Sequence, residues 1–302
     1  MTIVPSPIRT RRTLLAAMAL AAGGTLAARV PLPASRGGTV PGIRLGTQTN
    51  AYPIDPKDFA TFLAALESVK AIGFEGFETG YRNVEGQFRS PAEARAMIAA
   101  TGLTFFGIHI FLKHELYDTK TLLAPSSLYE QVALGGRSLG AQTLVLSGAA
   151  AADTAQLQAK IAALNRAGSF CKNTGMGLAY HNEEPESGSK IGELDVLYSE
   201  TDPASVGFVF DVGHLFNLDG DVVGFLGKHH KRIVGLHLRD YKDHHQVVLG
   251  TGSLPLQQIA QTLERLHWQG WVETEEERLD GVKHGEAYLK PAFFAMKGAF
   301  RP

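Results

Sequence analysis

Four short apolar segments of this chain each end in a side chain that can bind a metal ion. The segments GMGLAYHN, VGFVFDVGH, RIVGLHLRD and GWVETEEE contain, in that order, His181, Asp211, His237 and Glu275. Short, nearly continuous apolar runs predict buried strands of a parallel sheet. Strands that all deliver a polar group at their carboxyl ends are how a (β/α)8 barrel builds an active site, so this pattern favours that fold.

The chain after Gly42 alternates between short apolar runs and longer amphipathic stretches, which predicts eight strands that are each followed by a helix. The expected strands are 43–49, 74–78, 103–109, 142–147, 177–182, 206–211, 233–238 and 270–275. The expected helices lie near 56–71, 90–101, 126–139, 153–175, 190–199, 221–229, 255–267 and 283–299. This order predicts an α/β protein with a closed parallel (β/α)8 TIM barrel, in one domain of residues 36–302.

Residues two apart in a strand share a face, and this rule predicts which side chains point into the barrel. The expected inward pairs are Gly76 and Glu78, Gly107 and His109, Ala179 and His181, Val209 and Asp211, and Gly235 and His237. Larger residues, among them Phe106 and Val234, are expected on the opposite face, packed against the helices. The barrel mouth should therefore be polar on at least five strands.

The first 35 residues have the order of an export signal. Arg9, Arg11 and Arg12 precede an apolar stretch from Leu14 to Ala28, and the pair Arg11-Arg12 resembles a twin-arginine signal. We expect residues 1–35 to be this signal peptide, cleaved between Ala28 and Ser35, and the protein to be periplasmic or otherwise exported. The apolar stretch is shorter than the roughly 20 residues that span a bilayer, which favours cleavage over a permanent membrane anchor.

Composition excludes one class of partner and gives no sign of thiol chemistry. The formal net charge is -1, with 29 Lys and Arg against 30 Asp and Glu, and no basic run would track a phosphate backbone. We therefore expect a small-molecule partner and no nucleic acid. The single cysteine, Cys171, is interpreted as a buried, inert thiol rather than a nucleophile.

The residue types at the four strand ends indicate a particular class of metal. Imidazole nitrogens together with carboxylate oxygens suit Mn²⁺, Fe²⁺, Co²⁺ or Zn²⁺ better than Ca²⁺. We predict one divalent ion, with Mn²⁺ as the first candidate, bound by His181, Asp211, His237 and Glu275. Any one of these residues alone could equally be a hydrogen-bonded residue of the barrel mouth, and Glu273 remains the alternative to Glu275.

The segments LAYHNEE, FDVGHLF, GLHLRD, LGTGSLPLQQI and GWVETEEE resemble the xylose-isomerase-like barrel superfamily of sugar isomerases, epimerases and AP endonucleases. The resemblance covers residues 43–299 in the expected strand order. It implies a metal held by a carboxylate on strand five, an Asp on six, a His on seven and a Glu on eight. Carried over, these are positions 181, 211, 237 and 275.

Position 181 departs from that pattern, because the sugar epimerases carry Glu where this chain has His181. One of the two glutamates that flank the epimerised carbon is therefore missing, which makes two-faced epimerisation less probable. The YHN run at 180–182 resembles instead an exported subgroup called sugar phosphate isomerase/epimerase, with relatives that act on 3-keto sugars or glycosides. The resemblance implies a metal-dependent isomerase, epimerase or lyase for a keto or hydroxy sugar, including 3-keto glycosides.

The implied reaction is an enolisation, in which a metal stabilises an enediolate while a side chain moves the α-proton. We expect Glu275, His109 or His214 to be that general base. His214 follows Asp211 by three residues, and in the resembled family this position contacts substrate or metal-bound water. The alternative for His214 is a loop histidine that caps local backbone.

Substrate contacts are expected from Glu78, Arg239 and His214. Arg239 follows His237 by two residues and should project from the same face. Its alternative is an ion pair with Asp240 or Glu275. His244 and His245 are expected to be solvated in a polar loop.

Two rival functions are open to a barrel of this kind. A DNA-repair nuclease would need more nitrogen ligands and a basic groove, so we disfavour it. The second rival is a non-catalytic, exported sugar-binding or accessory barrel, and Ser147 and His181 in place of acids are its support. The chain could also form a homo-oligomer or be one subunit of a hetero-oligomeric lyase.

Overall fold

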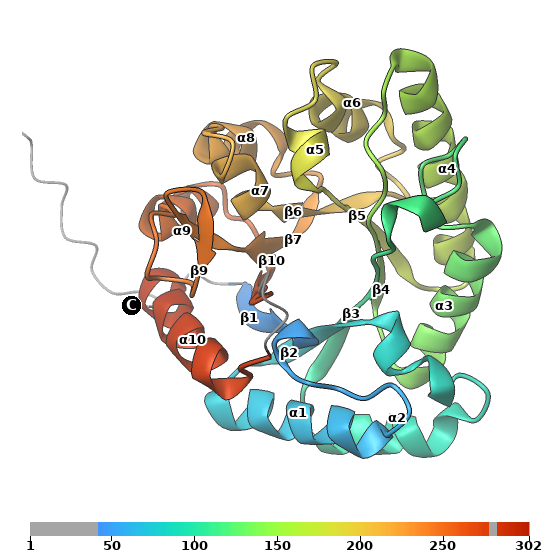
Figure 1. Cartoon of the computed structure of the whole chain (residues 1–302), viewed down its shortest axis with the longest axis vertical. Helices are drawn as coiled ribbons and strands as arrows, with labels where there is room; N and C mark the ends of the chain where they lie inside the picture. Colours follow the sequence, from blue (N-terminus) through green and yellow to red (C-terminus); the bar gives the residue numbers. More distant parts are fainter. Residues whose placement is uncertain (1–41, 278–282, 302) are drawn as a thin grey trace, which may run out of the picture. The chain divides into compact units, whose positions relative to one another are not determined.

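The computed structural model of the chain describes residues 42–277 and 283–301 (Figure 1). Its eight parallel strands close into a barrel in the order β1-β10-β7-β6-β5-β4-β3-β2. The predicted single-domain (β/α)8 barrel is therefore confirmed. The predicted signal peptide, residues 1–35, lies outside the described residues.

The barrel strands agree with the predicted ones to within two residues at each end. They are β1 (Ile43–Gln48), β2 (Gly76–Gly80), β3 (Thr104–Ile110), β4 (Thr143–Leu146), β5 (Gly177–His181), β6 (Gly207–Asp211), β7 (Ile233–Leu238) and β10 (Gly270–Thr274). Parallel pairing of Ile43 with Gly270 through Thr47 with Thr274 closes the ring. A short antiparallel hairpin, β8 (Asp240–Lys242) with β9 (His245–Val247), follows β7 and was not predicted.

The eight predicted helices surround the barrel (Figure 1). They are α1 (Phe59–Ile72), α2 (Pro91–Ala100), α3 (Ser126–Leu139), α4 (Thr154–Asn173), α6 (Glu193–Glu200), α8 (Val222–His229), α9 (Leu256–Arg265) and α10 (Glu286–Phe300). Of two further short helices, α5 (Glu184–Ser187) begins three residues after the end of β5 and α7 (Val212–Phe216) begins directly after β6. None of the helices in the described part is long and apolar enough to cross a membrane.

Local chemistry explains where the first helix begins and ends. The Asp58 side chain accepts a hydrogen bond from the Ala60 backbone N–H at 3.1 Å, which satisfies a donor at the start of α1. Gly73 ends α1 with φ 116°, a left-handed conformation that glycine adopts without steric cost. The chain is thereby turned back toward β2.

The barrel interior is layered from an aromatic floor to a polar mouth. Phe106 and Trp271 stack with their ring centroids 4.3 Å apart near the amino ends of β3 and β10. Val145, Ala179 and Val209 form a separate apolar cluster in the middle. The side chains two residues further along β4, β5 and β6 share the face of this cluster, so strand alternation places them at the mouth.

Phe106 corrects one sequence prediction. It was expected on the helix-facing side, but it contacts Trp271 inside the barrel. The pairing of β2 with β3 shifts here, because the consecutive residues Phe77 and Glu78 pair with Phe105 and Gly107. Phe106 is therefore an extra residue, and Phe105 takes the outward place against Phe77, with ring centroids 4.6 Å apart.

Val234 is a second correction with the same cause. The pairing of β6 with β7 shifts between Phe208 and Val209, whose partners are Ile233 and Gly235. Val234 was expected to be packed under a helix, but it is 47% exposed. A bulge adds one residue to one strand, and simple alternation does not reveal it.

Candidate metal centre

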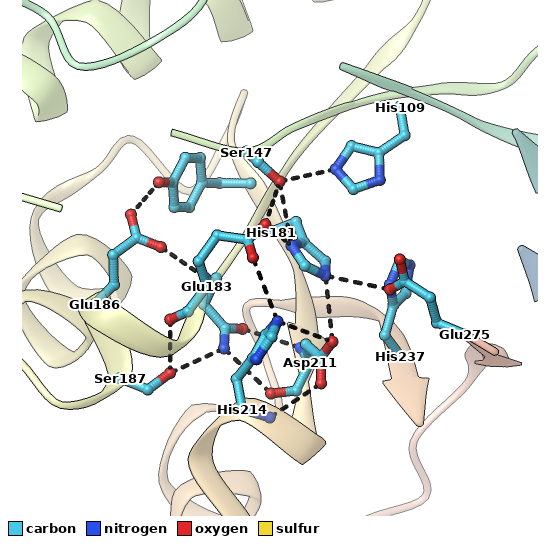
Figure 2. Close-up of polar contacts among 12 residues, drawn as sticks. His109, Ser147, His181, Glu183, Glu186, Ser187, Asp211, His214, His237 and Glu275 are labelled. Carbon is cyan, nitrogen blue, oxygen red and sulfur yellow. Dashed lines mark hydrogen bonds and ion pairs between the residues drawn. The ribbon is translucent and has the colours of Figure 1, made fainter. Parts of the chain in front are cut away.

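The four predicted metal ligands meet at the carboxyl ends of their strands (Figure 2). One atom each of His181, Asp211, His237 and Glu275 lies within 4.8 Å of all the others, and all four side chains are buried. The structure thus brings together residues that are 94 positions apart at the extremes of the set. Their role as ligands stays a prediction.

Two imidazoles present ring nitrogens to the centre of this group. His181 Nε2 makes no hydrogen bond among the described residues and lies 3.6 Å from Asp211 Oδ2 and 3.8 Å from Glu275 Oε2. His237 Nδ1 lies 2.6 Å from Glu275 Oε2. A buried nitrogen without a hydrogen bond is costly, and a cation between these atoms would satisfy it.

Asp211 is oriented by the helix that follows it. Its Oδ1 accepts hydrogen bonds from the backbone N–H groups of Gly213 and His214, at 2.8 and 3.2 Å. This is the usual bond of an N-cap aspartate, and it places Asp211 at the start of α7. The other oxygen, Oδ2, faces the centre and also accepts a hydrogen bond from Arg239 Nε at 2.7 Å.

Each of the three residues of the YHN segment, 180–182, makes a contact that shapes the site. Asn182 accepts a hydrogen bond from the Asp211 backbone N–H at 2.9 Å and donates one to the Asp211 carbonyl at 3.1 Å. The side chain of Asn182 therefore joins the end of β5 to the end of β6. The Tyr180 hydroxyl donates a hydrogen bond to Glu186, while His181 takes part in the buried ligand group.

The electrostatic field at the site favours positive charge. Five carboxylates surround the two imidazoles: Glu78, Glu183, Asp211, Glu273 and Glu275. The guanidinium of Arg239 lies among these carboxylates. Burial alone would lower the pKa of His181, but Asp211 and Glu183 raise it to about 10. The same field would stabilise a divalent cation. Two nitrogen and two oxygen donors fit Mn²⁺, Fe²⁺, Co²⁺ or Zn²⁺.

Glu275 is held on both of its oxygens. Oε1 lies 2.7 Å from Arg239 and accepts a hydrogen bond from Asn50 at 3.1 Å, while Oε2 faces His237. Burial would raise the pKa of Glu275, but Arg239 and His237 outweigh it and hold that pKa at about 2. A carboxylate with so low a pKa is a weak base, which favours its role as a ligand over that of proton acceptor.

Glu273, the alternative ligand, lies on the other side of the His237 ring. Its Oε1 is 3.0 Å from His237 Nε2, and Glu78 Oε1 is 3.5 Å from the same nitrogen. Burial and the charge of Glu78 raise the pKa of Glu273 to about 8. These three residues form a second group close enough to hold an ion. The geometry nevertheless fits a simpler role, in which Glu273 orients His237 from behind.

Glu78 and His109 lie beside this deeper group. Glu78 has no exposed surface, and its Oε1 accepts a hydrogen bond from Gln48 at 2.9 Å and lies 3.1 Å from His109 Nδ1. Glu78 is not among the residues that line the cavity, and its predicted contact with substrate stays a prediction. His109 lines the cavity described below, and its Nε2 is 2.9 Å from Ser147 Oγ.

Arg239 and His214 both line the cavity. Arg239 donates to Asp211 Oδ2 at 2.7 Å and pairs with Glu275, so one of its two predicted ion pairs is present. The other predicted partner, Asp240, instead accepts bonds from the backbone N–H groups of 250, 252 and 254. His214 Nε2 lies 3.5 Å from Asp211 Oδ2, on the cavity side.

A cavity of about 650 Å³ opens above the four groups, in the range of small-molecule sites. Aromatic and amide side chains line its outer part, including Tyr52, Tyr81, Asn83, Phe111, Tyr241 and Gln246. His244 is exposed, as expected, and it also lines the cavity, with a 2.9 Å hydrogen bond between its Nδ1 and the Asn217 carbonyl. The unpredicted β8–β9 hairpin carries both Tyr241 and Gln246 to the rim.

Glu183 is the site residue that the sequence analysis missed. It lies two residues after His181, with Oε1 at 3.2 Å from His181 Nδ1 and Oε2 at 3.3 Å from His214 Nε2. Burial would raise its pKa, but hydrogen bonds with these two imidazoles hold it well below the usual range. The LAYHNEE segment contained the only available signal, an acid just beyond a strand that ends in a candidate ligand.

Comparisons with known proteins agree with this fold. Inosose dehydratase from Salmonella agona (strain SL483) is 28% identical over 154 residues, 45% of this chain and 49% of the relative, so the chain matches about half the length of that enzyme. The 3-keto-D-glucoside 4-epimerase from E. coli superposes with a TM-score of 0.62 at 16% identity, covering 82% of this chain and 99% of that one. The IolI protein with a bound zinc atom superposes with a TM-score of 0.68 at 12% identity, covering 85% and 98%. The family model described as xylose isomerase-like TIM barrel matches residues 66–292, and the chain belongs to that family.

Proposed function

We propose that the chain is a divalent-metal-dependent enzyme that moves a proton next to the carbonyl of a keto sugar or keto glycoside. The reaction would be an isomerisation, an epimerisation or a lyase elimination. The observation that carries the proposal is the meeting of His181, Asp211, His237 and Glu275 beneath a polar, aromatic-lined cavity. The names of the dehydratase and epimerase relatives support sugar chemistry of this type.

A metal held by these four groups would act as a Lewis acid on the sugar oxygens and stabilise the charge of an enediolate. His214 is the side chain best placed to move the proton. It lines the cavity and is 9% exposed, and its Nε2 lies 3.3 Å from Glu183 Oε2, a carboxylate that can orient the ring. His109, buried but also at the cavity wall, is the second candidate.

Deuterium exchange tests the proposal. The purified chain is stripped with a chelator, reloaded with Mn²⁺ and incubated in D₂O with a panel of keto sugars and 3-keto glycosides, and exchange at the α-carbon is followed by NMR. We expect exchange that requires the metal. Metal binding without exchange or turnover on any member of the panel would favour the sugar-binding or accessory role instead.

Two variants separate the roles of ligand and base. His214→Gln should retain one metal per chain but lose about 10²–10⁴-fold in exchange rate, the usual contribution of a general base. Glu275→Gln should lose both metal and exchange. His230→Gln is the control, because His230 caps the carboxyl end of α8, is not among the cavity-lining residues, and its Nδ1 lies 3.1 Å from the Gly227 carbonyl oxygen.

We also propose that the protein is exported through a twin-arginine signal in residues 1–35. The support is the Arg11-Arg12 pair followed by an apolar stretch and small residues. From the segment YHN at 180–182 we also propose that the chain belongs to the exported subgroup described in the sequence analysis.

A further inference from the structure

Glu183 contacts two site histidines at once. Its Oε1 lies 3.2 Å from His181 Nδ1 and accepts a hydrogen bond from Ser147 Oγ at 2.8 Å, while its Oε2 lies 3.3 Å from His214 Nε2 (Figure 2). The side chain is 20% exposed. It is therefore close to the candidate ligands without being one of the four that converge.

The position of Glu183 is fixed from outside the barrel. Its backbone N–H donates to Glu186 Oε2 at 2.8 Å. Glu186 is buried and paired with Lys160 and the Tyr180 hydroxyl. Lys160 in the remote helix α4 and Tyr180 in β5 thus hold Glu186, which in turn fixes where the chain leaves β5 at Glu183.

A neutral imidazole carries one proton, and the partner of that proton decides which nitrogen remains free to bind a metal. His181 Nδ1 faces the Glu183 carboxylate, which can only accept a hydrogen bond when ionised. Nδ1 should therefore carry the proton. The unprotonated nitrogen is then Nε2, which faces Asp211 and Glu275 and has no hydrogen bond among the described residues.

We propose that Glu183 is a positioning residue for the metal centre: it holds His181 in the Nδ1–H form with Nε2 directed at the cation, and places negative charge behind this ligand. Carboxylates behind metal-bound histidines raise the basicity of the imidazole and fix its orientation. The inference rests on the proposed metal site but not on the proposed sugar chemistry.

Metal affinity tests this role without any turnover. Wild type, Glu183→Gln, Glu183→Asp and the control Glu200→Gln, an exposed carboxylate on α6, are stripped with a chelator and titrated with Mn²⁺ by calorimetry. We expect Glu183→Gln to bind about 10–100-fold more weakly, the usual effect of losing such a carboxylate. Glu183→Asp should recover part of the loss, and Glu200→Gln should match wild type. In the Zn²⁺-loaded wild type, ¹⁵N NMR should show His181 protonated at Nδ1.

Three results would overturn the proposal. The first is Mn²⁺ affinity of Glu183→Gln within twofold of wild type. The second is a fall in melting temperature of the stripped variant that accounts for the weaker binding, since this would assign Glu183 to the fold. The third is a wild-type chain that binds no metal. A wild type that binds metal normally but exchanges no sugar proton would instead refute the proposed function and leave the role of Glu183 intact.

Discussion

Replacing Lys160 with methionine tests how the outer wall of the barrel is held together. The Lys160 side chain in α4 has no exposed surface. Its ammonium group donates to the Ala149 carbonyl at 2.8 Å, to Glu193 Oε1 at 2.8 Å and to Glu186. Methionine has a similar length and no charge, so Lys160→Met removes the cation while leaving little empty space.

The expected loss in the free energy of unfolding follows from Glu186 and Glu193, which remain buried after Lys160 is replaced. Removing one partner of a buried ion pair costs about 3–5 kcal/mol, because the other partner stays buried without compensation. For a chain of this size, that corresponds to a fall in melting temperature of roughly 6–20 °C. Isosteric changes in well-packed apolar positions cost less, about 1.5 kcal/mol or below. The size of the loss in stability therefore shows whether Lys160 acts as the cation of a buried ion pair or only fills space.

The loss of stability in Lys160→Met should also depend on pH, and the pKa of Glu186 determines whether it grows or shrinks as the pH rises. Burial raises the pKa of Glu186, and Lys160 opposes this. Without Lys160 the pKa should rise further. A group whose pKa is raised on folding adds stability below its unfolded pKa and loses it as the pH rises through the folded pKa. The deficit of Lys160→Met relative to wild type should therefore be smaller at pH 5 than at pH 8.

Urea and thermal unfolding followed by circular dichroism at both pH values measure this effect. Lys172→Met is the matched control, because Lys172 is in the same helix and exposed. It should unfold within about 0.5 kcal/mol of wild type, as surface substitutions usually do. A Lys160→Met deficit below about 1 kcal/mol, or one equal at the two pH values, would refute the reasoning.

Other parts of the chain give shorter tests. His237→Ala should bind no stoichiometric Mn²⁺ and lose the metal-dependent stabilisation, about 2.7 kcal/mol at a metal concentration 100 times Kd. The control His230→Ala should keep both the metal and the stabilisation. Retained metal in His237→Ala would show that the ligand set is a different one. Burial raises the pKa of Cys171 to about 12, so a thiol reagent at pH 8 should label the native protein slowly and the unfolded protein at once. Fast labelling of the native protein would contradict its burial. Changing Arg11 and Arg12 to Lys should retain the protein in the cytoplasm, and unchanged export would remove the twin-arginine assignment.

The residues that the sequence placed correctly at the barrel mouth follow the regular geometry of strands, while their roles stay predictions. His181 and Asp211 end apolar runs, and the residues two before them, Ala179 and Val209, are small or branched and fill the barrel interior. Because the period of a strand is two, one inward residue predicts the next. The same rule fails at Phe106 and Val234, where a register shift adds one residue.

The features that were missed depend on contacts between distant segments. Lys160 looks like a surface residue of an amphipathic helix, and only the positions of α5 and α6 make it a buried cation. The β8–β9 hairpin has three-residue strands with little apolar alternation, so the sequence around His244 reads as a loop. Glu183 lies beyond the end of β5, where no periodic rule says in which direction a side chain points.

The combination of His181 with Glu183 leads to one further prediction. The family resemblance of the sequence implies Glu at the position of His181 in sugar epimerases, and a carboxylate there would add negative charge that attracts a metal ion. In His181→Glu the new carboxylate would lie beside Glu183 and Ser147, which now face His181 Nδ1 at 3.2 and 3.3 Å. Like charges at this distance repel, and burial makes the repulsion stronger.

The effect of Glu183→Gln on Mn²⁺ affinity should therefore reverse between the two backgrounds. With His181 present, the change removes the carboxylate that orients the ligand and weakens binding. With Glu at 181, it removes a repulsion and should strengthen binding. Calorimetric titration of the four proteins measures the coupling between the two positions directly. Equal effects of Glu183→Gln in both backgrounds would mean that Glu183 acts on the site through its overall charge and not through the His181 ring.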